Sequence, residues 1–114
     1  MKLYSYASCS TCRKAIAWLK ERGIAATPID ITSTPPSAEE LQQGLAQLGR
    51  KRLFNTSGQS YRTLGSAAVQ AMDDGQAIAA LAADGRLVKR PFLITDAGQV
   101  VTGFKPEEWE ALLG

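Results

Sequence analysis

The first 31 residues carry a strand–helix–strand pattern, and this pattern restricts the fold more than any other feature of the sequence. A short apolar segment over 3–6 precedes residues 10–22, where apolar side chains recur at helical spacing. Gly23 ends this helix, and a second strand-like segment follows over 26–31. Two strands joined by one crossover helix pair in parallel. The sequence therefore predicts a β-α-β unit at the start of the chain.

The middle of the chain, over about 37–84, predicts a helical insertion. Ser37 and Glu40 have the spacing of a capping box, and three leucines at helical spacing continue the helix to Gly49. The polar stretch after it predicts a loop, and two alanine-rich segments predict short helices. These segments are 55–60 for the loop, and near 65–72 and 75–83 for the helices.

The last third of the chain returns to strands. Segments 92–95 and 99–102 flank Asp96-Ala97-Gly98, which is a hairpin turn signal, and Pro106 opens a terminal helix. The element order is β-α-β, a helical insertion, then β-β-α, which is an α/β class. A chain of 114 residues with 45% hydrophobic residues fits one globular domain over 1–114.

Cys9 and Cys12 lie where the first strand ends and the first helix begins. Unpaired N–H groups and the helix dipole at such an end stabilise a thiolate, and Arg13 and Lys14 add positive charge. These features predict a lowered pKa for Cys9, and the thiolate is the nucleophile in disulfide exchange. Cys12 lies one turn later on the inward stripe, where it could resolve a mixed disulfide on Cys9.

Two other roles for the cysteine pair stay open. A CxxC sequence can be half of a zinc site, but zinc normally takes four protein ligands, and this chain has no histidine and no third cysteine. Both cysteines could instead be inert, small, apolar side chains. The N-terminus has no signal peptide and no apolar run could span a bilayer, so we expect a cytoplasmic protein whose disulfide is transient.

The net charge and the other notable side chains say less about the function than the cysteine pair does. A net charge of +2 does not indicate nucleic-acid or membrane binding. The basic run 50–52 is expected to be a solvated helix end, since cations are favoured there. Trp18 and Trp109 are expected to pack in amphipathic helices. The stretch 55–58 is either a donor-rich anion loop or a plain polar loop.

Several segments, in this order and spacing, resemble the arsenate reductase/Spx family. Together these segments span nearly the whole chain. The first is Tyr4 followed by Cys9-x-x-Cys12-Arg-Lys-Ala and Ala17-Trp18-Leu19. The others are Phe54-Asn55-Thr56-Ser57-Gly58 with Tyr61-Arg62, then Lys89-Arg90-Pro91, then Gly103-Phe104-Lys105. The resemblance implies a thioredoxin-like fold with a helical insertion between its two halves. It also implies that Cys9 is the nucleophile and that Cys9 and Cys12 form a redox-active disulfide, as in Spx and its relatives.

The resemblance also implies an anion site built around Arg90. An arginine there would offer a planar fork of donors to an oxyanion or a carboxylate, and the Arg90-Pro91 bond is expected to be cis. Of three arginine positions in arsenate reductases of this family, only Arg90 matches; the others fall at Asn55 and at Phe104, beside Lys105. We therefore expect little arsenate reduction. The predicted substrate-binding residues are Arg13, Asn55, Pro91 and Lys105.

Two functions follow as hypotheses. The first is an arsenate-reductase-like thiol–disulfide oxidoreductase with no bound cofactor or metal, reduced by glutathione, glutaredoxin or thioredoxin. The second is an Spx-like redox-sensing regulator that binds RNA polymerase. The chain closes at Gly114 directly after its last helix, without the charged tail of many Spx-like regulators, which favours the enzyme. We expect a monomer in either case.

Overall fold

A computed structural model describes the whole chain, Met1–Gly114, and contains one four-stranded sheet. Strand β1 pairs in parallel with β2 and antiparallel with β3, and β3 pairs antiparallel with β4, giving the order β2-β1-β3-β4. The strands are β1 (Lys2–Ser5), β2 (Pro28–Asp30), β3 (Phe92–Ile94) and β4 (Val100–Thr102). This is the thioredoxin-like β-α-β … β-β-α arrangement that the sequence predicts.

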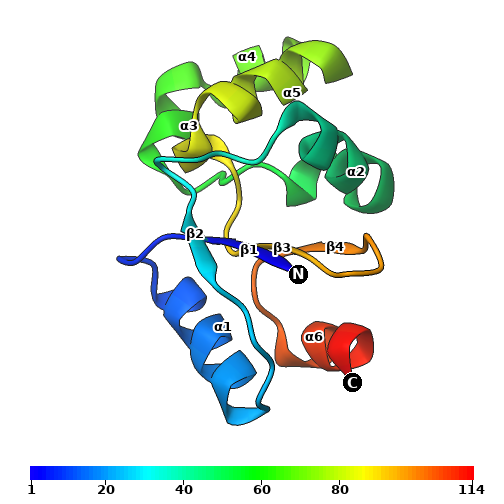
Figure 1. Cartoon of the computed structure of the whole chain (residues 1–114). Coiled ribbons are helices and arrows are strands. Elements are labelled where there is room, and N and C mark those ends of the chain that lie inside the picture. The colour runs from blue at the N-terminus through cyan, green and yellow to red at the C-terminus, as the bar shows by residue number, and fades with distance from the viewer.

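Helices cover both faces of the sheet (Figure 1). One face carries α1 and α6, and the helices between β2 and β3 lie on the other. Their bounds are α1 (Ser10–Glu21), α2 (Ala38–Leu48), α3 (Gln59–Leu64), α4 (Ser66–Ala71), α5 (Asp74–Ala83) and α6 (Pro106–Leu113), with short 3-10 turns η1 (Arg50–Arg52) and η2 (Gly85–Leu87). The predicted helical insertion is therefore present.

The strands alternate between two hydrophobic clusters because successive side chains point to opposite faces. Leu3 packs with Leu93 and the fully buried Trp109 on the α1 and α6 side, while Tyr4 and Phe92 pack under the insertion. Trp109 also packs edge to face against Trp18, with ring centroids 6.1 Å apart. Both tryptophans are thus packing residues, as the sequence predicts.

The predicted capping box at Ser37 and Glu40 is present and also ties α2 to the sheet. Each residue accepts a hydrogen bond from the backbone N–H of the other. Glu40 further accepts from the Tyr4 hydroxyl at 2.6 Å and from the Lys2 ammonium at 3.0 Å. Burial opposes ionisation of Glu40, but these donors outweigh it and lower the pKa of its carboxyl.

Helix α3 differs from the prediction, which placed a loop through residue 60 and no helix before 65. The helix begins at Gln59 within the polar stretch, and no side chain caps it. Its stabilising contact is tertiary: the Tyr61 ring packs edge to face on Phe54, with centroids 6.1 Å apart. The two predicted alanine-rich helices correspond to α4 and α5.

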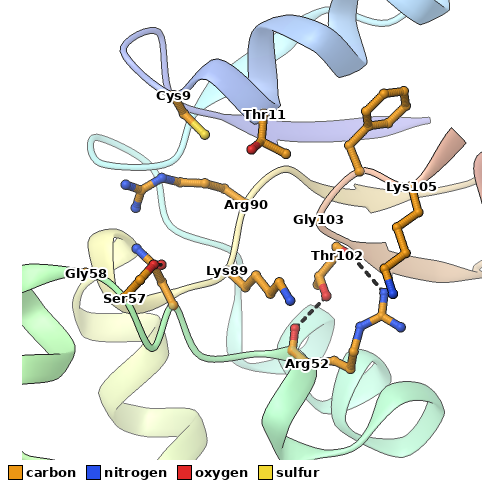
Figure 2. Close-up of a pocket in the computed structure, with 12 residues that line it drawn as sticks. Cys9, Thr11, Arg52, Ser57, Gly58, Lys89, Arg90, Thr102, Gly103 and Lys105 are labelled. Carbon is orange, nitrogen blue, oxygen red and sulfur yellow. Dashed lines mark hydrogen bonds between the residues drawn. The ribbon is translucent and has the colours of Figure 1, made fainter.

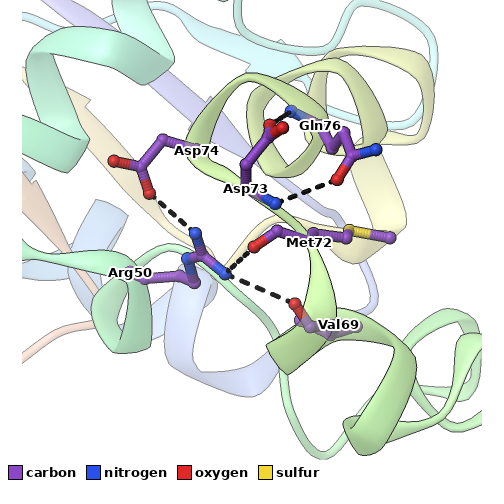
Figure 3. A network of polar contacts seen from close by, with 6 residues as sticks. All are labelled: Arg50, Val69, Met72, Asp73, Asp74 and Gln76. Carbon is purple, nitrogen blue, oxygen red and sulfur yellow. Dashed lines mark hydrogen bonds and ion pairs between the residues drawn. The ribbon is translucent and has the colours of Figure 1, made fainter.

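The expectation that the basic run 50–52 is a solvated helix end is wrong for Arg50 and Arg52, whereas Lys51 is exposed as expected. Arg50 donates to the Met72 carbonyl at 2.8 Å, to the Val69 carbonyl at 3.4 Å and to Asp74 at 2.7 Å (Figure 3). It thereby satisfies carbonyls at the end of α4 and pairs with the first residue of α5. The side chain is only 28% exposed, because these groups surround it.

Two backbone features complete the frame of the site. The Arg90-Pro91 peptide bond is cis, as the resemblance implies. At Gly85 in η2 a Cβ would lie 1.7 Å from the Ile31 carbonyl oxygen, so the insertion approaches the end of β2 at a point where only glycine fits.

None of the helices combines the length and the apolar composition that crossing a lipid bilayer requires.

Candidate functional site

Cys9 occupies the N-cap of α1, with its backbone extended at φ −87° and ψ 118°. Its Sγ accepts a hydrogen bond from the Cys12 N–H at 3.4 Å, in the position where a serine or aspartate oxygen usually caps a helix. Cys9 is partly exposed and Cys12 is fully buried, and both are free thiols. The predicted arrangement of an exposed and a shielded sulfur is therefore present.

The pKa of Cys9 lies below the ordinary thiol value. Partial burial opposes ionisation, but hydrogen bonds from the Cys12 backbone and thiol outweigh it, helped by the charge of Arg90 and the Thr11 backbone. The direction agrees with the sequence prediction, but the cation differs. The prediction relied on Arg13 and Lys14, whereas Arg90 arrives from the segment before β3.

The pKa of Cys12 moves the other way. Burial raises the pKa of Cys12 to about 11, although a backbone hydrogen bond from Tyr6 acts against it. The hydrogen bond to Cys9 and the negative charge of Cys9 act in the same direction as burial. One turn of helix thus holds two thiols whose pKa values are shifted in opposite directions from the ordinary thiol value.

Cys9 opens onto a cavity of about 500 Å³ that gathers residues from four parts of the chain (Figure 2). The start of α1, the η1 region and the loop after it, the segment before β3, and the end of β4 all contribute. The lining residues are Cys9, Thr11, Arg52, Asn55, Ser57, Gly58, Lys89, Arg90, Thr102, Gly103, Phe104 and Lys105. Four of them are cations and none is an acid, so the cavity suits an anionic ligand.

The structure brings together only some of the predicted site residues. Asn55, Arg90 and Lys105 line the cavity with Cys9. Arg13 does not line it, because its guanidinium turns back and donates to the Ala7 carbonyl at 3.0 Å. Two further predicted residues, Cys12 and Pro91, are buried and do not line the cavity.

Arg52 and Lys89 line the cavity but were absent from the predicted site. Arg52 donates to the Thr102 carbonyl at 2.9 Å and pairs with Glu108 at 3.1 Å. Lys89 directly precedes Arg90 in the Lys-Arg-Pro segment that resembles the family. This neighbouring position could have indicated that Lys89 also lies at the site. For Arg52 no local signal existed, since its partners lie 50 and 56 residues away.

Arg90 is oriented by two contacts on its own side of the cavity. Its guanidinium lies 5.0 Å from the centre of the Tyr6 ring, and one nitrogen donates to the Arg86 carbonyl at 3.3 Å. A guanidinium has five N–H donors, so most of them remain free for a ligand. No group of three or more histidine, cysteine or acidic side chains gathers anywhere as a metal site would.

Comparisons with known proteins agree with this geometry. The model of the ArsC family matches residues 4–112. The chain is 42% identical over 113 residues to the uncharacterised protein YusI of Bacillus subtilis (strain 168), covering 96% of this chain and 95% of that one. The crystal structure of an ArsC family related protein from Bacteroides fragilis superposes with a TM-score of 0.87 at 43% identity, covering 97% of each chain.

More distant relatives carry two different functional names. An arsenate reductase of Neisseria meningitidis is 29% identical, covering 99% of this chain and 97% of that one. The global transcriptional regulator Spx 2 of Bacillus anthracis is 28% identical, covering 93% of this chain and 81% of that one. The match over almost all residues and the shared fold establish that this chain belongs to the ArsC family.

Proposed function

We propose that this protein is a thiol–disulfide oxidoreductase in which Cys9 attacks and Cys12 resolves. The observation that carries the proposal is the separation of the two thiols. Cys9 has a lowered pKa and opens onto a cationic cavity, while Cys12 is buried one turn behind it with a pKa of about 11. An inert pair of buried cysteines would not show this separation.

The reaction begins when the Cys9 thiolate attacks one sulfur of a substrate disulfide. The substrate S–S bond breaks, one half leaves as a thiolate that takes a proton from water, and the other half stays bound to Cys9. Cys12 then loses its proton and attacks the Cys9 sulfur. The second half of the substrate leaves as a thiol, and a Cys9–Cys12 disulfide remains. Two electrons have passed to the substrate.

Forming the mixed disulfide also prepares Cys12 to react. The negative charge of Cys9 is one cause of the raised pKa of Cys12, and that charge disappears when Cys9 is bound to the substrate. The pKa of Cys12 therefore falls at the step that needs its thiolate. Two glutathione molecules, or one glutaredoxin or thioredoxin dithiol, would return the two electrons. We propose that the reaction takes place in the cytoplasm, where such reductants keep thiols reduced.

Alkylation against pH tests the nucleophile. At pH 7 a thiol with a pKa of about 8.5 is roughly 3% ionised, whereas a thiol with a pKa of about 11 is ionised about one time in ten thousand. Iodoacetamide should thus modify Cys9 at least a hundredfold faster than Cys12, as read by peptide mapping. Cys9 reacting only near the free-thiol pKa would overturn the proposal.

Mass spectrometry tests the resolving step. Wild-type protein treated with oxidised glutathione should end as an internal Cys9–Cys12 disulfide without added mass. Cys12→Ser should instead stop at a mixed disulfide with glutathione on Cys9. Stable glutathione adducts on both wild type and Cys12→Ser would show that Cys12 does not resolve.

A regulatory function is the second candidate, because a relative that matches 93% of this chain is named as a global transcriptional regulator. In this case the Cys9–Cys12 pair would act as a sensor, and the protein would bind RNA polymerase. Pull-down of purified RNA polymerase by reduced and oxidised protein tests this directly. Binding that changes with the redox state, and is constant in Cys9→Ser, would favour the regulator over the enzyme.

A further inference from the structure

Three of the four cations of the cavity are not compensated by nearby acids. The ion pairs of the chain engage the N-terminal amine and four basic side chains, of which only Arg52 lines the cavity. Glu108 balances Arg52, whereas Lys89, Arg90 and Lys105 form no ion pair. Three like charges that converge on one cavity repel one another, and an anionic ligand would relieve that repulsion.

These cations form two groups rather than one. Figure 2 shows Arg90 on the same side as Cys9, while the ends of Lys89 and Lys105 lie toward Arg52 and Thr102 on the other side. The charge of Arg90 accordingly helps to lower the pKa of Cys9. Lys89 and Lys105 are therefore placed to bind a different part of a ligand from the part at the sulfur.

Backbone contacts fix the position of Lys89 beside the cavity. Its N–H donates to the Leu53 carbonyl at 2.7 Å, which fixes the main chain beside the cavity. Its side chain passes Gly103, where a Cβ would lie 3.3 Å from the Lys89 Cε. Gly103 has φ +70°, a region that favours glycine, so this residue serves both the turn and the passage of the lysine.

The size of the cavity also favours an elongated ligand. About 500 Å³ corresponds to roughly seventeen water molecules, each with a share of about 30 Å³ in the liquid. A compact oxyanion at Cys9 would fill only a small part of this space. A ligand that reaches from Cys9 to the two lysines uses more of the cavity.

We propose that Lys89 and Lys105 form a second anion subsite, separate from Arg90, for a low-molecular-weight thiol or disulfide. The ligand places its sulfur at Cys9 and a carboxylate or phosphate, several bonds from the sulfur, between the two lysines. This inference rests on the proposed function and specifies the substrate class. The redox step is the disulfide exchange at Cys9 described above.

Two aromatic disulfides of different charge test the subsite. Dithiobis(2-nitrobenzoate) carries a carboxylate on each ring, and 2,2′-dithiodipyridine carries none. In each case the Cys9 thiolate forms a mixed disulfide and releases one coloured aromatic product, and the attack of Cys12 then releases the second. In the Cys12→Ser background, which stops at the mixed disulfide, the release of the first product gives the rate of attack by Cys9. The ratio of the two rates measures the preference for an anion and cancels changes in the reactivity of Cys9.

The double variant Lys89→Gln, Lys105→Gln should lower this ratio about tenfold, since the charges act across a solvent-open cavity. The double lysine-to-arginine variant should keep the ratio, because it keeps the charge. Lys51→Gln is the matched control: Lys51 is exposed on η1 and outside the cavity, so the ratio should change less than about twofold. Circular dichroism checks that all variants are folded.

Competition with small free anions distinguishes a carboxylate from a phosphate as the group that the subsite binds. Succinate and inorganic phosphate should each slow the reaction of wild type with the carboxylated disulfide, and the stronger competitor identifies the preferred anion. Neither should slow the double glutamine variant further. An unchanged ratio in the double glutamine variant, or an equal fall in Lys51→Gln, would overturn the subsite. Slow reaction of wild-type Cys9 with both disulfides would instead overturn the proposed function.

Discussion

Replacing Arg50 with methionine tests the stabilising role that the structure gives to a residue of the basic run. The charged hydrogen bond to the Met72 carbonyl, at 2.8 Å, should contribute about 1.5–3 kcal/mol to the free energy of unfolding. The 3.4 Å contact with Val69 is at the limit of a hydrogen bond and adds little. Asp74 is 71% exposed, so its ion pair adds about 0–1 kcal/mol.

The expected loss for Arg50→Met is therefore about 2–3 kcal/mol, a sizeable part of the roughly 5–15 kcal/mol that stabilises a typical domain. Urea denaturation followed by tryptophan fluorescence should show a midpoint lowered by about 1–2 M. Asp74→Asn removes the ion pair alone and should cost less than about 1 kcal/mol. Lys51→Met, at the exposed neighbouring position, should be nearly neutral. Equal midpoints for Arg50→Met and Lys51→Met would refute the role of Arg50.

Three further predictions concern the site and its support. Tyr6→Leu should raise the pKa of Cys9, because the ring no longer orients Arg90, whereas Tyr6→Phe should keep the pKa low; alkylation against pH measures both. The carboxyl pKa of Glu40 is lowered in the folded state, so its contribution to stability is present above the unfolded pKa and is lost as pH falls through the folded pKa. Glu40→Gln should lower the urea midpoint at pH 7 and flatten its decline toward pH 3; a decline as steep as in wild type would contradict this. Little arsenate-dependent NADPH consumption is expected in a coupled glutathione–glutaredoxin assay, because Arg90 is the cation beside Cys9 and each missing charged partner costs about 1.5–3 kcal/mol. Rapid arsenate turnover that is lost in Cys9→Ser would show that the remote cations reach the anion.

The elements that the sequence predicts correctly are those with a local cause. The β-α-β opening follows from apolar periodicity, and the start of α2 follows from the Ser37 and Glu40 spacing. The position of the cysteine pair at the start of α1 is also predicted correctly, because it follows from where the local apolar periodicity begins. Such features depend on residues a few positions apart, and a single sequence contains that information.

The features that the sequence did not predict depend on partners far along the chain. Helix α3 has no capping side chain and packs through Tyr61, so nothing in its own residues distinguishes it from a polar loop. Arg50 and Arg52 look like a solvated helix end, and only the folded chain brings carbonyls and acids to them. The positive charge that lowers the pKa of Cys9 was assigned to Arg13 and Lys14, which lie four and five positions from Cys9, whereas it comes from Arg90, 81 positions away.

The cap of α1 also influences which redox state of the pair is favoured. The Cys12 N–H donates to the Cys9 sulfur, and Arg90 adds positive charge nearby. Both interactions are strong with a thiolate and weak with a disulfide sulfur, which carries no charge. They stabilise the reduced protein relative to the oxidised one, and stabilisation of the reduced form makes a disulfide a stronger oxidant. In the proposed reaction, the features that lower the pKa of Cys9 would therefore also favour reduction of a Cys9–Cys12 disulfide, the step that returns the protein to its dithiol form at the end of each turnover.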